Sequence, residues 1–297
     1  MNNEVIKLAV CITCHNRKEK TVDCLNSLYN QTILSSPFYQ LEVYLCDDGS
    51  TDGTGNIVRE LFPNVNIIQG DGELFWARGM EMAFSEAKKI HPDFFLMVND
   101  DVTFYNNMLE VMLNTYNNAF EKSGLISVVG SIQDPKTKEW TYGGKLWNKK
   151  RYKDIKSIVY PEKEFANCDL ANWNCFLLPF KLAKKVGNIE SKYSHAMADY
   201  DYSIRILKAK GKIVVASDYV GTCSRNETKG TWQDLTLPLL KRYKLLHKVT
   251  ARPIKSYIHY CKVAYGKRWL YWFCLQYIWI AKTSMIYSIK EFKNAGK

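Results

Sequence analysis

The sequence predicts an α/β fold, in which a mostly parallel sheet is flanked by helices and followed by a C-terminal helical extension. Three observations lead to this prediction. Strand-like and helix-like patterns alternate along residues 7–98, polar clusters stand at the ends of strand-like runs, and charge and composition change near residue 237. Such alternation is typical of parallel strands joined by helices that cover both faces of the sheet.

Short apolar runs in the first part of the chain predict buried strands, and the stretches between them carry apolar side chains at helical spacing. The predicted strands cover residues 7–13, 41–46, 65–69 and 93–98, and the predicted helices cover residues 20–31, 53–62 and 76–90. Together they form the parallel half of the sheet.

The second part of the chain is less regular. Residues 125–132 and 212–217 predict strands, and residues 199–211 predict a helix that ends at a glycine. Residues 140–147 have a Gly-Gly centre between aromatic residues and predict a hairpin.

The composition is that of a globular protein with a sizeable core. Of the 297 residues, 46% are hydrophobic and 24% are charged, which excludes a disordered protein, a collagen-like fibre and a small disulfide scaffold. The net charge is +11, but residues 237–297 hold 13 Lys/Arg and one acid, so this segment carries +12 and the rest about −1. We therefore predict two domains, residues 1–236 and 237–297.

The nine cysteines are scattered through apolar runs, and no signal-like segment precedes them, which favours reduced thiols and a cytoplasmic location. Cys11 and Cys14 have the C-x-x-C spacing of metal and redox sites, but no second pair exists and both fall in or beside a predicted strand. The chain has neither G-x-G-x-x-G nor G-x-x-x-x-G-K-[ST], which argues against a Rossmann dehydrogenase and a P-loop NTPase.

Polar clusters at residues 13–16, 47–52 and 99–101 follow three of the predicted strands. Ligands of parallel α/β sheets bind beyond the carboxyl ends of the strands, so the clusters indicate one binding site. Asp100 and Asp101 would repel each other unless a cation offset them, and carboxylates together with a nucleotide diphosphate suit Mg²⁺ or Mn²⁺. Asn and Asp are also common turn residues, so the residues alone leave an ordinary turn open.

Several motifs occur in a characteristic order: V-C-I-T-C-H-N-R, L-C-D-D-G-S-T-D and N-D-D, with G-D-G-E-L-F-W-A-R-G-M and A-D-Y-D further along. In this combination the chain resembles the family 2 glycosyltransferases of GT-A fold, in particular bacterial members of rhamnosyltransferase type. The resemblance covers about residues 5–225 and implies a Rossmann-like, mostly parallel sheet.

The resemblance implies roles for residues on the donor side. Thr13, His15 and Asp48 match positions that hold the nucleotide base, and Asn16 lies beside them. His15 stands where many relatives have Tyr, and an imidazole can also stack on a base. Arg78 matches a basic residue near the diphosphate.

The resemblance also implies a metal site. Asp100 and Asp101 match the D-x-D motif, in which Asp101 binds Mg²⁺ or Mn²⁺ and Asn99 supplies a neutral oxygen or a ribose contact. Many relatives add a His after the last strand, but residues 220–226 contain none, so either Cys223 or Asn226 replaces it or the metal is held weakly.

On the acceptor side, Asp199 matches the catalytic base of the family, although it also suits the N-cap of the following helix, as Asp201 does. Trp173 and Asn174 stand in a polar-aromatic segment before it and are predicted to contact the acceptor, with packing in the core as the alternative.

The predicted function is inverting, metal-dependent transfer of a sugar from a dTDP- or UDP-linked donor to a saccharide or lipid-linked acceptor, in bacterial surface polysaccharide synthesis. Two alternatives stay open. A nucleotidyltransferase of similar fold would need a glycine-rich phosphate loop, which is absent after the first strand. A basic nucleic-acid-binding protein would use the C-terminal charge, but the aromatic run there suits lipid or protein better, so no nucleic-acid partner is expected.

Residues 269–289 form a run long enough to cross a bilayer, but polar residues and Lys282 dilute it, and its aromatic residues suit the membrane interface. Upstream cations, which include Arg242, add to the basic character. We therefore expect this segment to bind an anionic membrane surface, peripherally at the inner face of the cell membrane. A cap on the domain, a homodimer contact and a true membrane span are the alternatives.

Overall fold

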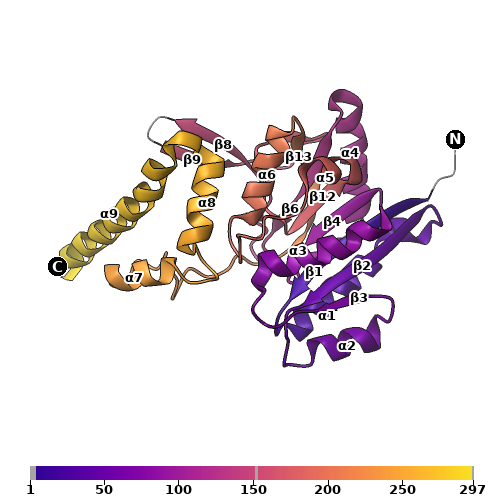
Figure 1. Ribbon diagram of the computed structural model, residues 1–297, viewed down its shortest axis with the longest axis horizontal. Helices are drawn as coiled ribbons and strands as arrows, with labels where there is room; N and C mark the ends of the chain where they lie inside the picture. Colours follow the sequence, from indigo (N-terminus) through magenta and orange to yellow (C-terminus); the bar gives the residue numbers. More distant parts are fainter. Residues whose placement is uncertain (1–4, 151–152, 296–297) are drawn as a thin grey trace. The chain divides into compact units, whose positions relative to one another are not determined.

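The computed structural model describes residues 5–150 and 153–295, and the chain forms two compact units (Figure 1). The N-terminal unit comprises the residues up to Ser191 together with Ala198–Arg225. The C-terminal unit comprises Lys192–Met197 and the residues from Asn226 on. The predicted domain boundary at residue 236 stays a prediction, and residues 1–4 and 296–297 of the two predicted domains lie outside the described residues.

A large mixed sheet forms the centre of the N-terminal unit, with strand order β10-β13-β6-β12-β4-β1-β2-β3 and with β5 and β7 paired to β13 and β6. The strands β3, β2, β1 and β4 are parallel neighbours, as the alternating pattern predicted. The bounds of the strands are β1 (Ile6–Cys14), β2 (Tyr39–Asp47), β3 (Asn66–Gln69), β4 (Phe94–Val98), β5 (Thr103–Phe104), β6 (Ile126–Gln133), β7 (Trp140–Tyr142), β10 (Ala166–Cys168), β12 (Cys175–Pro179) and β13 (Lys212–Thr222).

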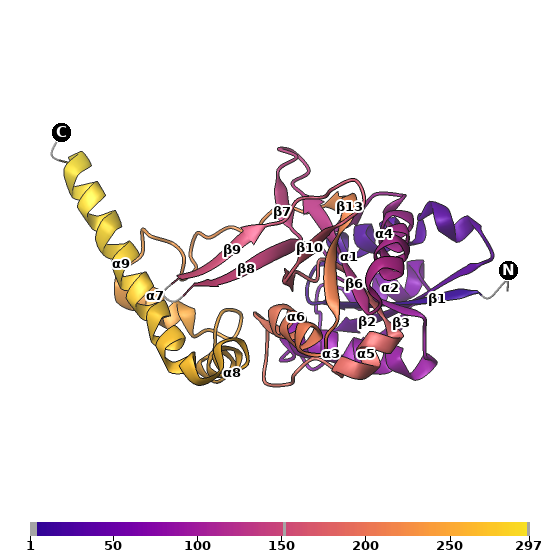
Figure 2. The same ribbon diagram turned by 90° about the horizontal axis from the view of Figure 1, so that it is seen from above.

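Helices cover both faces of this sheet (Figure 2). Leu8, Val10 and Ile12 of β1 point to one face, where they share a core with α1, α2 and α4. The next residue, Thr13, points to the other face, where α3 packs against β1 and β2, with α5 and α6 beside it. The bounds of the helices are α1 (Lys18–Tyr29), η1 (Thr32–Ser35), α2 (Thr54–Leu61), α3 (Phe75–Ala87), η2 (Lys88–Ile90), α4 (Met108–Ser123), α5 (Phe180–Val186) and α6 (Ala198–Lys208). The predicted α/β fold class is confirmed.

The hairpin predicted at residues 140–147 is wrong. Its first part, β7, pairs with β6, whereas β8 (Gly144–Lys150) pairs with β9 (Lys153–Ile158) and β11 (Leu170–Ala171) in a separate sheet. Gly143 between them has φ of 153°, and a Cβ atom there would lie 3.0 Å from Nε1 of Trp140. At this glycine the chain therefore changes direction and passes from one sheet to the other. A local sequence pattern does not distinguish such a change from a tight turn.

The C-terminal unit contains the helices α7 (Leu239–Leu246), α8 (Ile254–Tyr265), η3 (Gly266–Arg268) and α9 (Trp269–Ala295). Arg242 joins α7 to α9, because its Nε donates to the carbonyl of Trp232 at 2.9 Å and its Nη1 to the carbonyl of Ile280 at 3.2 Å. Its side chain is fully buried, so the expectation that Arg242 contributes to a basic surface is wrong. Among the described residues, no helix has both the length and the apolar character needed to cross a membrane.

Candidate functional site

The three polar clusters meet at one edge of the sheet, because β2, β1 and β4 are parallel neighbours. Cys14 at the end of β1 pairs in register with Asp47 at the end of β2. The segment Asn99–Asp100–Asp101 follows β4 directly on the other side of β1. The structure thus brings the predicted donor and metal residues to the carboxyl ends of the strands, where α/β sheets bind ligands.

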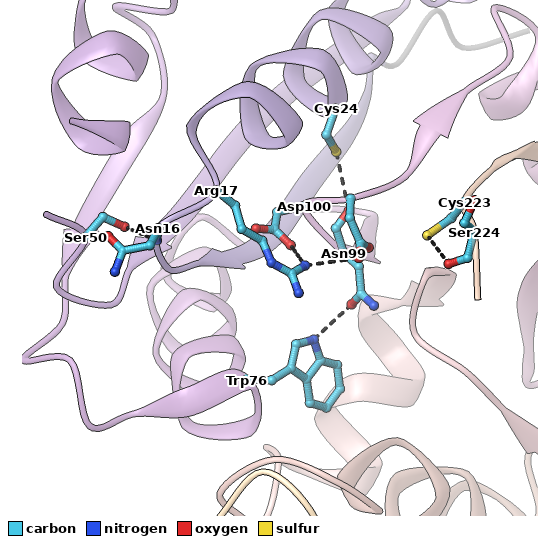
Figure 3. Close-up of polar contacts among 10 residues, drawn as sticks. Asn16, Arg17, Cys24, Ser50, Trp76, Asn99, Asp100, Cys223 and Ser224 are labelled. Atoms are coloured by element: carbon cyan, nitrogen blue, oxygen red, sulfur yellow. Dashed lines mark hydrogen bonds and ion pairs between the residues drawn. The ribbon is translucent and has the colours of Figure 1, made fainter. Parts of the chain in front are cut away.

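Asn16 fastens the loop after β1 to the loop after β2. Its backbone is left-handed, with φ of 51°, a conformation that Asn tolerates better than most residues. Its Oδ1 accepts a hydrogen bond from the backbone N–H of Thr51 at 2.7 Å, and its own N–H donates to Oγ of Ser50 at 3.0 Å (Figure 3). The side chain of His15 lies over this junction, with Nδ1 at the carbonyl of Asp48.

Asp48 is buried and orders the loop after β3. Its carboxylate accepts hydrogen bonds from the backbone N–H groups of Gly72 at 2.9 Å, Leu74 at 3.2 Å and Phe75 at 2.8 Å. The same loop passes so close to Gly49 that a Cβ atom there would lie 2.8 Å from the nitrogen of Gly72. Asp48 therefore holds the start of α3 against the end of β2.

Residues of α3 face the end of β4. Trp76 donates from Nε1 to Oδ1 of Asn99 at 2.9 Å, which holds the amide beside the acidic residues (Figure 3). Gly79 lets α3 approach β1, because a Cβ atom there would lie 2.2 Å from Oγ1 of Thr13. Arg78 is exposed on the same helix and donates to the carbonyl of Glu73 at 3.5 Å.

Asp100 and Asp101, here called the acidic pair, are held by Arg17. Nη1 of Arg17 lies 3.0 Å from Oδ1 of Asp100 and 3.0 Å from Oδ2 of Asp101. Oδ2 of Asp100 and Oδ1 of Asp101 are buried and have no hydrogen-bond partner. The sequence analysis assigned no role to Arg17, although Arg17 is the last residue of the V-C-I-T-C-H-N-R motif.

Burial raises the pKa of Asp100 to about 6, and the neighbouring charge of Asp101 acts in the same direction while Arg17 opposes it. The folded protein therefore binds a proton here that the unfolded chain releases near pH 4, the ordinary range of an aspartate. In the metal-free protein this carboxylate thus lowers the free energy of unfolding as pH rises toward 6. A bound cation would stabilise the ionised carboxylate and so offset this decrease in the free energy of unfolding.

The acidic pair fits a hard divalent cation, because its two unpartnered oxygens are buried and carboxylates suit Mg²⁺ and Mn²⁺. No group of three or more His, Cys, Asp or Glu suited to a metal occurs within the described residues. Burial and the charge of Asp101 raise the pKa of Cys223 to about 12, so the thiol is protonated when no metal is bound. A role of Cys223 as a metal ligand stays a prediction. Asn226, the other predicted substitute, belongs to the C-terminal unit.

Asp199 lies at the start of α6. Its Oδ2 accepts a hydrogen bond from Nδ2 of Asn172 at 3.1 Å, and its Oδ1 accepts one from the backbone N–H of Tyr200 at 2.8 Å. Burial raises its pKa above the ordinary range of an aspartate, with Lys145 acting against this. Asp201 differs, because it is buried and bonded at 2.8 Å to Nε of Arg205 within the same helix.

Two cations over the ring of Trp140 were not foreseen from the sequence, and one of them, Lys145, also acts on Asp199. Lys145 on β8 donates to Oη of Tyr200 at 2.9 Å, and its Nζ lies 5.5 Å from the ring centre of Trp140. Arg225 lies over the same ring, with Cζ at 5.7 Å. These residues come from separate strands and a loop, so no local motif connects them.

Trp173 and Asn174 are buried, Trp173 with only 1% of its surface exposed. Its ring stacks on Phe176 at 5.5 Å and meets Tyr202 edge-on at 5.0 Å, so it is part of the core on the α3 and α6 face. Its edge also meets Trp76 at 6.1 Å. Contact of Trp173 and Asn174 with an acceptor stays a prediction.

Comparison with known proteins identifies the fold. Among solved structures, this chain is similar to GalNAc-T7 with UDP, GalNAc and Mn²⁺, at a TM-score of 0.62 and 14% identity over 88% of this chain and 48% of that one. It is also similar to S. aureus TarS 1–349 in complex with UDP-GlcNAc, at a TM-score of 0.56 and 16% identity over 89% of this chain and 72% of that one. The chain thus spans about half the length of the GalNAc-T7 chain.

A search of curated proteins found no match. Residues 9–176, more than half of the chain, match the family model described as Glycosyl transferase family 2. These residues run from β1 to β12 and include the acidic pair and the residues around Asp48. With this match and the GT-A architecture of its sheet, the chain belongs to glycosyl transferase family 2.

Proposed function

We propose that this protein is an inverting glycosyltransferase that moves a sugar from a nucleotide-diphosphate donor to a saccharide or lipid-linked acceptor. The observation that carries the proposal is the acidic pair, which lies at the carboxyl end of β4 with buried, unpartnered carboxylate oxygens. The similar proteins GalNAc-T7 and TarS were solved with UDP or UDP-GlcNAc, which supports a nucleotide-linked donor.

On the donor side, we assign the nucleoside to the loops after β1 and β2, with Thr13, His15, Asn16 and Asp48. The imidazole of His15 offers a ring for stacking on a base. Asn99 and Asp100 would continue this surface toward the phosphates, and Arg78, exposed on α3, is the cation assigned to them.

Asp101, together with Asp100, would hold Mg²⁺ or Mn²⁺, which when bound supplies positive charge to the departing nucleoside diphosphate. The resemblance of the G-D-G-E-L-F-W-A-R-G-M segment to rhamnosyltransferases favours dTDP-rhamnose as the donor, with a UDP-linked sugar as the alternative.

On the acceptor side, we assign Asp199 as the general base. Its carboxylate would take the proton of the acceptor hydroxyl while that oxygen bonds to the anomeric carbon and the bond to the diphosphate oxygen breaks. Asn172 holds the carboxylate, and Lys145 adds positive charge near it. Trp173 and Asn174, being buried, would act by supporting Trp76 and the surface above them.

The donor assignment is tested by thermal unfolding with UDP and dTDP, each with and without Mn²⁺. A ligand that binds only the folded protein stabilises it by about 2.7 kcal/mol at one hundred times its dissociation constant. For a chain of 297 residues, with an unfolding entropy of about 2.1 cal/mol/K per residue, that corresponds to an upward shift of the midpoint by about 4 °C. We expect a Mn²⁺-dependent shift with one nucleotide; a folded protein that responds to neither would contradict the assignment.

We also propose that α9 binds an anionic membrane surface, in keeping with synthesis of bacterial surface polysaccharide at the inner face of the cell membrane. One side of α9 carries exposed apolar residues whose spacing of three, four, seven or eight places them on one face: Leu270, Ile278, Met285, Ile289 and Phe292. Phe292 is 83% and Ile278 is 61% exposed, whereas Ile280 on the opposite side is fully buried. Exposed Lys241, Lys267 and Lys290 supply charge that suits an anionic leaflet.

Vesicle binding tests this second proposal. We expect the full chain to sediment with vesicles that contain anionic phospholipid, and the double variant Ile278→Ser, Met285→Ser to bind at least about tenfold more weakly, because each side chain contributes burial free energy. Leu61→Ser, which removes an exposed apolar residue from the N-terminal unit, is the matched control. A dimer in solution that the double variant dissociates, with no binding to vesicles, would show that a second copy covers this face.

A further inference from the structure

Arg17 occupies the place of a cation at the acidic pair. A single nitrogen, Nη1, contacts one carboxylate oxygen of Asp100 and one of Asp101, each at 3.0 Å. The carboxylate side chains are only 7% and 10% exposed, whereas the Arg17 side chain is 41% exposed. Figure 3 shows the guanidinium reaching across to Asp100 from the loop that precedes α1.

This contact compensates the charge of the acidic pair only in part. One oxygen of each carboxylate stays buried without a hydrogen-bond partner, although a guanidinium has five N–H donors. The two carboxylates carry two negative charges and the guanidinium carries one positive charge. A divalent ion would neutralise both carboxylates. Because cations repel each other strongly at such short distances, Arg17 and a divalent ion exclude each other from this place.

The local structure lets the side chain of Arg17 leave without disturbing the loop. The backbone before it is held by the hydrogen bonds of Asn16 to Thr51 and Ser50, and the N–H of Lys18 after it donates to Oδ2 of Asp52 at 3.1 Å. Among the described residues, the guanidinium donates hydrogen bonds to the acidic pair alone, and 41% of the Arg17 side chain is exposed. Only side-chain rotation is needed to free the carboxylates.

We infer that Arg17 is an exchangeable counter-ion, which pairs with Asp100 and Asp101 in the metal-free protein and is displaced when a divalent ion binds. The inference rests on the proposed function and deepens it. Because the ion pairs of Arg17 must break first, the metal alone binds weakly. A nucleoside diphosphate offers the displaced guanidinium a new anionic partner, so metal and nucleotide strengthen each other's binding.

Mn²⁺ binding, measured by the electron paramagnetic resonance signal of the free ion, tests the inference without any assay of activity. Without nucleotide, Arg17→Gln is expected to bind Mn²⁺ about tenfold more tightly than the unmodified protein, within the usual range of coupling between sites. With UDP present, the enhancement of Mn²⁺ affinity seen in the unmodified protein is expected to shrink in the variant. Arg17→Lys, which keeps the charge, is expected to lie between the two.

Lys181→Gln is the matched control, because it removes an exposed positive charge from α5, which begins beside the start of β4 and not beside its carboxyl end. It should change Mn²⁺ affinity by less than about twofold, since exposed charges are screened. Circular dichroism establishes that each variant is folded.

Equal or weaker Mn²⁺ affinity in a folded Arg17→Gln protein would overturn the inference. If the unmodified protein still binds Mn²⁺ through Asp101 in that case, the proposed function stands and only the role of Arg17 falls. If neither protein binds Mn²⁺, with or without UDP, then the inference and the proposed metal site both fall.

Discussion

Replacing Asp199 by Asn is expected to lower the rate of sugar transfer by about 10²–10⁴-fold, the usual contribution of a general base. The amide has nearly the same shape but takes up no proton from the acceptor hydroxyl. Its oxygen can keep the hydrogen bond from Asn172, so the start of α6 should remain in place. Binding of the nucleotide, read from the thermal shift, should be unchanged, because Asp199 lies outside the donor residues.

The pH profile separates this role from a structural one. Burial raises the pKa of Asp199, and a base acts only when ionised, so the rate of transfer should fall on the acid side, at a pH above the ordinary range of aspartate. This decrease in rate at acid pH should be absent from the pH profile of the residual activity of Asp199→Asn. Asp218→Asn, at an exposed position of β13, is the control. Transfer by Asp199→Asn within about twofold of the unmodified protein would remove Asp199 as the base.

Replacing Asp101 by Asn is expected to reduce metal-dependent transfer by about 10²–10³-fold, comparable to losing one group that stabilises a developing negative charge. The substitution removes a charge that the metal needs, and it leaves Arg17 paired with Asp100. It also relieves the repulsion within the acidic pair, which helps to raise the pKa of Asp100. The variant should therefore stay folded.

The measurements for Asp101→Asn are nucleoside diphosphate release from the nucleotide sugar in the presence of acceptor, and Mn²⁺ affinity in parallel. Both should fall together. Asp23→Asn, at an exposed position of α1, serves as the matched control. If transfer stays metal-dependent and as fast as in the unmodified protein, the assignment of Asp101 to the metal is wrong.

The sequence indicated the site through residues that follow strands. Asp48 and Asn99–Asp101 were foreseen because apolar runs mark the strands of a parallel sheet, and the residues after them meet at one edge. The hydrogen bonds that these residues make with one another and with neighbouring loops were not foreseen. Asp48 binds three backbone N–H groups of the loop at residues 72–75, and Asn16 links two loops, because hydrogen bonds between distant segments leave no periodic signal.

The amino-acid pattern by itself determined the α/β class, the four parallel strands and the basic C-terminal segment, because burial and charge leave regular traces along a chain. Only the tertiary structure decided that β12 runs antiparallel between β4 and β6, that β7 and β8 enter different sheets, and that Arg242 is buried. It also decided that Arg17 pairs with Asp100 and Asp101. Strand pairing and ion pairing depend on which side chains, distant in the sequence, are buried next to one another. In the buried interior, where the dielectric constant is low, an unpaired charge is costly.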